Sequence, residues 1–188
     1  MTGNLASVLK MFAPFADDEL KVIGNHFKLK TVLKNEILLR EGSVCKHFYF
    51  IHIGGIRTFF TDMNGHEKTR YIMLKNHLGT ALTSFTAQKP SVECIEAFEV
   101  TELSAIHHTD FYRLINEMEN FSKFYQRILE MAYAFQNRKI EQRVRLTAKQ
   151  RYDQIMQESP ELIQQVSNRI LASYLDIREE TLSRLKSG

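Results

Sequence analysis

The sequence predicts an α+β fold in which an antiparallel β-roll of the jelly-roll type is followed by a long helix and a C-terminal helix-turn-helix. Residues 29–106 alternate in polarity with period two and are punctuated by turns, which is typical of short strands that close into a roll. After Thr109 the period becomes helical, and residues 167–186 read as two short helices around one turn. We therefore expect three segments, namely the roll over 1–117, the long helix over 118–137 and the helix-turn-helix over 138–188.

Composition excludes several classes of protein. The 188 residues are 44% hydrophobic and 25% charged, which is ordinary for a globular chain. No apolar run approaches the roughly 20 residues of a membrane span, and the N-terminus reads as a helix rather than a signal peptide, so no membrane partner is expected. Two cysteines, Cys45 and Cys94, are too few for a disulfide-dense scaffold or an all-cysteine iron–sulfur cluster. We expect a cytoplasmic protein with reduced thiols.

The first element to justify is a helix near the N-terminus, where Asp17 and Asp18 would lie at the positive end of the helix dipole. The roll follows. Asn64-Gly65 predicts a hairpin between two of its strands, because this pair suits a tight turn in which both residues have positive φ. The expected strands cover residues 48–53, 56–60, 68–74 and 92–106.

After the roll, Asp110 is expected to cap a helix that begins at Phe111. The next stretch has apolar residues at spacings of 3, 4, 3, 4 and 3, which is the heptad pattern of a coiled-coil seam. We expect this seam to hold a homodimer together, although a core helix within a single chain would fit the same spacing. The seam consists of Met118, Phe121, Tyr125, Ile128, Ala132 and Phe135.

A further helix with Ile140 and Val144 on one face should end at Ser159-Pro160. The helix-turn-helix follows, with Ser167 or Asn168 as the cap of its first helix and Asp176 in left-handed geometry at the turn. Its second helix would present a polar face to DNA, and a helical hairpin without a DNA role is the open alternative. The expected base-reading residues are Arg178, Glu179, Glu180, Thr181, Ser183 and Arg184, and the expected phosphate contacts are Lys149, Arg169 and Lys186.

Charge distribution agrees with that assignment without deciding it. Residues 138–188 contain ten Lys or Arg against seven Asp or Glu, and this excess equals the whole net charge of +3. A basic C-terminal end suits a nucleic-acid surface, but a solvated helix with scattered lysines fits equally well.

These motifs resemble those of the catabolite activator (Crp/Fnr) family of bacterial regulators over nearly the whole chain. The resemblance implies that the roll binds an effector, that the long helix dimerises, and that the last helix reads the major groove of a pseudo-palindromic operator in double-stranded DNA. It also implies that Glu180 and Arg184 read bases, that Thr181 meets phosphate, and that RNA polymerase is a candidate partner. The motifs are Arg40-Glu41-Gly42, Phe48 to Ile51, Gly54-Gly55-Ile56-Arg57, Leu78-Gly79 and Arg178 to Leu185.

Two departures from the family pattern matter. Members that bind cyclic nucleotides carry a Glu after the Leu-Gly step and an Arg before a Ser-Ala step, whereas Thr80 and Pro90 stand at these positions here. Cyclic AMP is therefore not the expected effector, and no cofactor is expected beyond an unknown small molecule. The second departure concerns the family's winged hairpin, which should follow the recognition helix and which we expect to be absent or truncated here. The expected effector pocket comprises Leu78, Gly79, Thr80, Thr83, Ser84, Lys89, Ser91, Tyr125 and Leu129.

Two rival functions remain. A regulatory module that binds a ligand or a protein without DNA would keep the same sensor fold. A cupin-like metal enzyme would need two His separated by one residue on one strand face, but His47 and His52 are five apart and His107 and His108 are adjacent. We therefore expect neither a catalytic nor a metal site.

Overall fold

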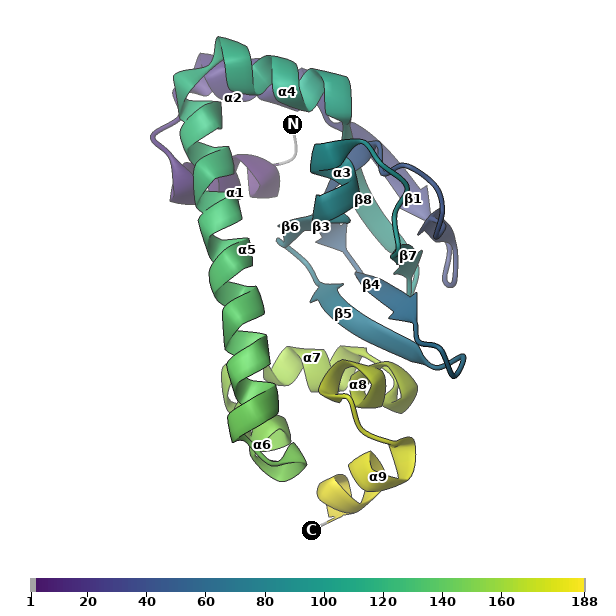
Figure 1. The fold of residues 1–188 in the computed structure, drawn as a ribbon. Coiled ribbons are helices and arrows are strands. Elements are labelled where there is room, and N and C mark those ends of the chain that lie inside the picture. The colour runs from purple at the N-terminus through teal and green to yellow at the C-terminus, as the bar shows by residue number, and fades with distance from the viewer. Residues whose placement is uncertain (1–2, 188) are drawn as a thin grey trace. The chain divides into compact units, whose positions relative to one another are not determined.

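The computed structural model describes residues 3–187 and divides the chain into two compact units (Figure 1). Within this range the first unit holds the residues up to Thr58 together with Ile72–Glu130. The second unit holds Phe59–Tyr71 and the residues from Met131 onward. The second unit thus combines the tip of a β-hairpin with the helical C-terminal part of the chain.

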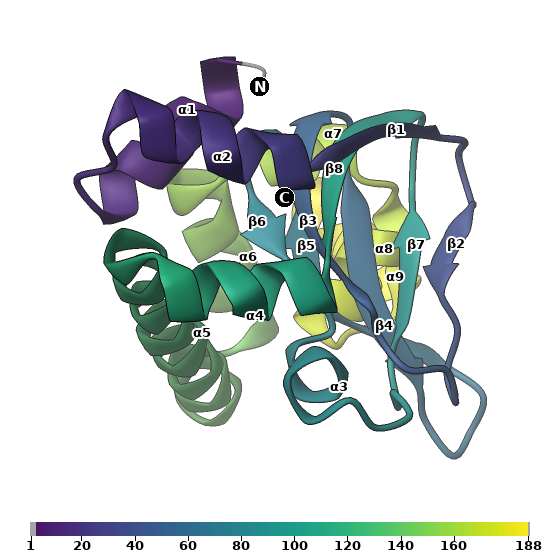
Figure 2. The same cartoon turned by 90° about the horizontal axis from the view of Figure 1, so that it is seen from above.

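The expected antiparallel roll is confirmed. Its strands form two four-stranded sheets with the orders β1-β8-β3-β6 and β2-β7-β4-β5 (Figure 2). In the first sheet β8 pairs antiparallel with both β1 and β3, so that Phe48 lies opposite Ile106. The strands are β1 (Lys28–Val32), β2 (Ile37–Leu39), β3 (His47–Ile53), β4 (Ile56–Thr61), β5 (Glu67–Met73), β6 (Leu78–Gly79), β7 (Cys94–Ala97) and β8 (Thr101–His107).

Strand β3 lies at the centre of the first unit's core, because it is buried on both faces. Helices α1 (Gly3–Phe12) and α4 (His108–Glu117) pack against it. The Phe48 ring stacks on Phe111 of α4 with ring centres 4.9 Å apart. In the other sheet, Arg57 of β4 makes two hydrogen bonds at 2.8 and 2.6 Å to one Glu96 oxygen, so this buried charge is paired.

Two local details of the strands differ from the expectation. At the hairpin tip only Gly65 has positive φ, at 81°, while the Asp62 side chain accepts hydrogen bonds from the backbone N–H groups of Asn64 and His66. This Asp62-centred loop replaces the two-residue turn that needs positive φ twice. The single run expected over 92–106 is divided into β7 and β8 by a bend.

The helices also begin and end differently from the prediction in places. His107 Nδ1, not Asp110, accepts the capping hydrogen bond of α4, from Thr109 N. Met118 has extended backbone geometry and separates α4 from α5 (Glu119–Arg145), so the seam does not begin inside the long helix. Other helices of this first part are α2 (Asp17–His26) and α3 (Leu82–Ala87).

Beyond α5 the chain turns at Thr147, which together with Gln150 forms a capping box for α6 (Ala148–Glu158). This break was missed by the sequence analysis, although Thr147-x-x-Gln150 is its usual signature. The expected end at Ser159-Pro160 is confirmed, and Pro160 is also the first residue of α7 (Pro160–Gln165). Then come α8 (Asn168–Leu175) and α9 (Glu179–Ser187).

Candidate nucleic-acid interface and effector pocket

Helices α8 and α9 form the expected helix-turn-helix. Ser167 Oγ accepts a hydrogen bond from Ile170 N at 3.3 Å and caps α8, as predicted. Asp176 ends α8 in the left-handed region with φ 55° and ψ 47°, also as predicted. Leu171 of α8 and Leu182 of α9 are fully buried, so the two helices share a small core. The turn and this core fix the orientation of α9 relative to α8.

The polar residues expected to read bases are exposed, whereas Leu182 of the same helix is buried. Arg178 lies just before α9, and the other members lie along it. An exposed face that alternates guanidinium, carboxylate and hydroxyl groups can present donors and acceptors to the edges of base pairs. The exposed set is Arg178, Glu179, Glu180, Thr181, Ser183 and Arg184.

The three expected phosphate-binding cations each have a partner within the second unit. Lys149 Nζ lies 3.7 Å from Asp153 in α6, and Lys186 donates to the Asn168 side chain at 2.6 Å. Arg169 forms an ion pair at 2.6 Å with Glu67 of strand β5. That pair joins α8 to the hairpin tip.

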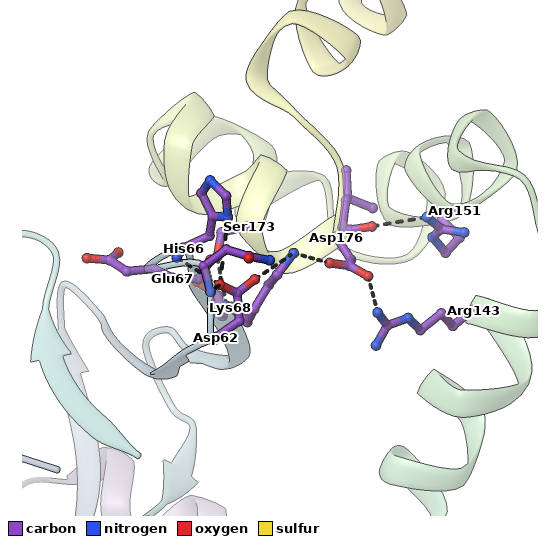
Figure 3. A network of polar contacts seen from close by, with 11 residues as sticks. Asp62, His66, Glu67, Lys68, Arg143, Arg151, Ser173 and Asp176 are labelled. Carbon is purple, nitrogen blue, oxygen red and sulfur yellow. Dashed lines mark hydrogen bonds and ion pairs between the residues drawn. The ribbon is translucent and has the colours of Figure 1, made fainter. Parts of the chain in front are cut away.

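Asp176, at the turn of the helix-turn-helix, is the centre of a polar network (Figure 3). Its carboxylate accepts from Lys68 Nζ of β5 at 2.6 Å and pairs with Arg143 of α5. Arg151 of α6 donates at 3.1 Å to the carbonyl of Leu175, next to Asp176. Burial raises the pKa of Asp176, but the hydrogen bond from Lys68 and the charge of Arg143 outweigh it and leave the pKa below its usual value.

Strand β5 is the last strand of its sheet, and its edge is covered by side chains of the second unit. Ser173 Oγ of α8 accepts from Thr69 N at 2.7 Å and can donate to Glu67 O at 2.8 Å. Lys139 Nζ of α5 donates to Arg70 O at 2.9 Å and lies 3.8 Å from the centre of the Tyr174 ring. These residues were not predictable from the sequence, because no local pattern pairs the edge of a strand with helices so far along the chain.

The second unit also contains a cavity of about 870 Å³. Its walls come from the hairpin and from α5, α6 and α8, and Lys139 is one of the lining residues.

In the first unit, three of the four hydroxyls expected to line the effector pocket donate to the protein's own backbone. Thr80 Oγ1 donates to His47 O at 2.7 Å, Ser84 Oγ to Lys89 O at 2.6 Å, and Ser91 Oγ to Glu93 O at 2.9 Å. Since a hydroxyl has one proton to donate, none of the three has a donor left for a phosphate. The Lys89 side chain is exposed.

The other expected pocket residues differ in environment. Tyr125 is buried against the ring of Phe111, and its hydroxyl lies 3.1 Å from that of Tyr112. Burial and this hydrogen bond raise the pKa of Tyr125. Leu129 is 37% exposed, and Thr83 is also exposed. Leu78 and Gly79 form the short strand β6 beside β3. A separate hollow of about 320 Å³, lined from Ile37 to Tyr49, contains none of the expected pocket residues.

Apart from Met118, which precedes α5, the residues of the expected dimer seam lie on the face of α5 that packs within the chain. Phe121 is fully buried and Tyr125 nearly so, and the Phe135 ring contacts Tyr71 of β5 with centres 5.1 Å apart. Ile128 and Ala132 are half-buried, as is Met118 between α4 and α5. A different stripe of α5 carries exposed large apolar side chains at heptad-compatible spacings, consisting of Leu129, Tyr133, Ile140 and Val144.

Residues 3–187 contain neither a candidate metal site nor a helix suited to span a membrane. No three His, Cys, Asp or Glu side chains in this range are placed to hold a metal ion. None of its helices is both long enough and apolar enough to cross a membrane.

Comparisons with known proteins agree with this architecture. The cyclic nucleotide-binding domain family matches residues 29–118. The catabolite activator protein of Thermus thermophilus is similar with a TM-score of 0.62 at 18% identity, covering 96% of this chain and 85% of that one. FixK2 of Bradyrhizobium japonicum gives 0.74 at 15% identity, over 86% and 83% of the two chains. The c-di-GMP responsive regulator CLP of Xanthomonas campestris gives 0.68 at 15% identity, over 92% and 90%. No curated protein sequence matches the chain significantly.

The order of parts in this chain, a β-roll followed by a long helix and a helix-turn-helix, is thus shared in fold with these solved structures. Residues 29–118 match the cyclic nucleotide-binding domain, and the chain shares its fold with a solved regulator of the Crp/Fnr family, which confirms the fold expected from its motifs.

Proposed function

We propose that the chain is a DNA-binding transcription regulator whose helix α9 reads base edges in the major groove. The exposed polar face of α9, held by the left-handed Asp176 and the buried Leu182, is the observation that supports this most directly. Arg184 can donate to guanine O6 and N7, and Glu180 can accept from cytosine N4.

The proposal predicts that the full-length chain selects a specific motif from random DNA duplexes. Replacing Arg184 with Ala should cost about 1–3 kcal/mol of binding free energy and relax the preference at one base position. Selection followed by titration of the enriched duplex measures both effects. Lys149→Ala is the comparison variant, because loss of a phosphate contact should weaken all sequences alike and flatten the salt dependence. Enrichment of no motif would favour a ligand-binding or protein-binding module without a DNA role.

We further propose that the regulator acts as a homodimer through the exposed stripe of α5. Leu129, Tyr133, Ile140 and Val144 would repeat along one side of a coiled-coil pair. A symmetric dimer would bind a pseudo-palindromic operator with half-sites about one helical turn, ~34 Å, apart.

The effector of the first unit is, in this proposal, a small molecule other than cyclic AMP. The hydroxyls of Thr80, Ser84 and Ser91 donate inside the protein, and Pro90 offers neither a charge nor an N–H. CLP, which is similar in fold, is described as responsive to c-di-GMP, so an effector other than cyclic AMP has a precedent among the structural relatives.

A further inference from the structure

Three residues at the start of β5 reach three residues of the helix-turn-helix within the second unit. Glu67 pairs with Arg169, and Lys68 pairs with Asp176, each at 2.6 Å. Ser173 takes the hydrogen bond of Thr69 N. We call this set of contacts the hairpin clamp, and Figure 3 shows its Lys68–Asp176 pair.

The Glu67–Arg169 pair is the part of the clamp that concerns DNA directly. Arg169 lies in the first turn of α8 and is one of the three cations expected from the sequence to contact DNA phosphate. A carboxylate at 2.6 Å offers the guanidinium the same kind of anionic oxygen acceptor as a phosphate does. Glu67 therefore occupies Arg169 in the way that a DNA phosphate would.

The Lys68–Asp176 pair acts on the position of the recognition helix. Asp176 is the left-handed residue that sets the direction in which α9 leaves α8. Lys68 binds this residue from the hairpin, while Arg143 binds it from α5. The hairpin therefore binds both Arg169, the expected phosphate contact, and Asp176, the turn residue of the helix-turn-helix.

The clamp has the properties of a releasable contact. Its ion pairs are partly exposed, with Arg169 at 64% and Glu67 at 27%, and pairs of this kind stabilise only weakly. A cavity of about 870 Å³ lies among the same elements. The helix-turn-helix buries Leu171 of α8 and Leu182 of α9, and neither of these side chains belongs to the clamp contacts.

We propose that the hairpin clamp is autoinhibitory, in that Glu67 and Lys68 restrain Arg169 and Asp176 and must release them before the helix-turn-helix binds DNA at full affinity. This inference rests on the proposed function, because it describes the regulation of the same DNA-binding surface. Since β4 and β5 continue from the clamp into a sheet of the roll, the restraint is built into the sensor's own strands.

The decisive variant is the double replacement Glu67→Gln with Lys68→Gln in the full-length chain. It removes one negative and one positive charge, so the net charge is unchanged and a general electrostatic effect on DNA affinity cancels. Release of the clamp should tighten binding of the selected duplex by about threefold to tenfold at fixed salt, given two weak ion pairs. Glu158→Gln, which removes a carboxylate paired with Arg138 elsewhere in the second unit, controls for loss of one negative charge.

Two further measurements complete the test. In an Arg169→Gln background, Glu67→Gln should tighten DNA binding less than it does in the wild-type background, because the Glu67–Arg169 pair is already gone. In the free protein, hydrogen exchange at residues 67–71 should become faster in the double variant. An affinity of the double variant equal to or below that of the wild type would overturn the clamp while leaving the proposed function intact. If neither the wild type nor any variant binds DNA, the proposed function is wrong and the inference that rests on it is wrong as well.

Discussion

At the scale of single residues, Lys139 is a buried charge that joins helix α5 to strand β5 and loses part of its hydration in doing so. Its ammonium group donates to Arg70 O and lies over the Tyr174 ring. Burial, followed by the charges of Arg70 and Arg143, lowers the pKa of Lys139 to about 8 from 10.5. The folded protein therefore holds this proton less tightly than the unfolded chain does.

This has a consequence for stability. Between about pH 8 and pH 10.5 the unfolded chain binds more protons at Lys139 than the folded chain, so the contribution of Lys139 to the free energy of unfolding rises with pH. The difference in unfolding free energy between the wild type and Lys139→Met should grow by about 1–2 kcal/mol from pH 8 to pH 9.5. Urea unfolding at several pH values measures it. Lys123→Met, at an exposed lysine of α5, is the control, and a difference that stays constant with pH would contradict the assignment.

At the scale of elements, the predictions held where the signal was local. Ser167 as a cap and Asp176 as a left-handed turn were predictable because each depends on the chemistry of one side chain and its immediate backbone. The Thr147 capping box was just as local and was missed, because the apolar period continues across it. Heptad spacing in α5 was detected correctly, but spacing alone does not say which of two apolar faces is covered by the same chain.

The structure therefore predicts a dimer interface at the exposed stripe of α5, and not at the seam from Met118 to Phe135 that the heptad spacing indicated. Val144 is 81% exposed, so Val144→Asp should leave the protomer folded while placing two like charges in the proposed interface. We expect a loss of about 3 kcal/mol or more in dimerisation free energy, or about a hundredfold in dissociation constant. Sedimentation equilibrium measures the shift.

Ala134→Asp is the matched control, because it adds the same charge at an exposed position of α5 outside the stripe. A wild type that is monomeric at micromolar concentration would exclude this interface, and so would equal weakening by the two variants.

At the scale of the whole molecule, the order of roll, long helix and helix-turn-helix was predictable from the sequence. The division into two compact units was not, because residues Phe59–Tyr71 of the roll belong to the unit that holds the C-terminal helices. The hairpin around Gly65 was predictable from its turn residues. Its membership in the same unit as α8 was not, because Glu67 and Arg169 are 102 residues apart and no local period encodes their pairing. Likewise, Thr80 and Ser84 could be named as pocket residues from the motif, whereas the backbone acceptors that occupy their protons are visible only in the fold.

The effector question can be tested on the full chain. Thr80 and Pro90 replace the acid and the Arg of the cyclic-nucleotide-binding pattern, and each missing charge-assisted hydrogen bond is worth about 1.5–3 kcal/mol. Cyclic AMP and cyclic GMP should therefore bind about two to four orders of magnitude more weakly than to a site that keeps both residues. Calorimetry measures the affinity, and the affinity for the selected duplex should not change when either nucleotide is added. A dissociation constant in the low micromolar range would contradict this, and loss of that binding in Lys89→Ala would then identify the exposed Lys89 as the cation that replaces the Arg.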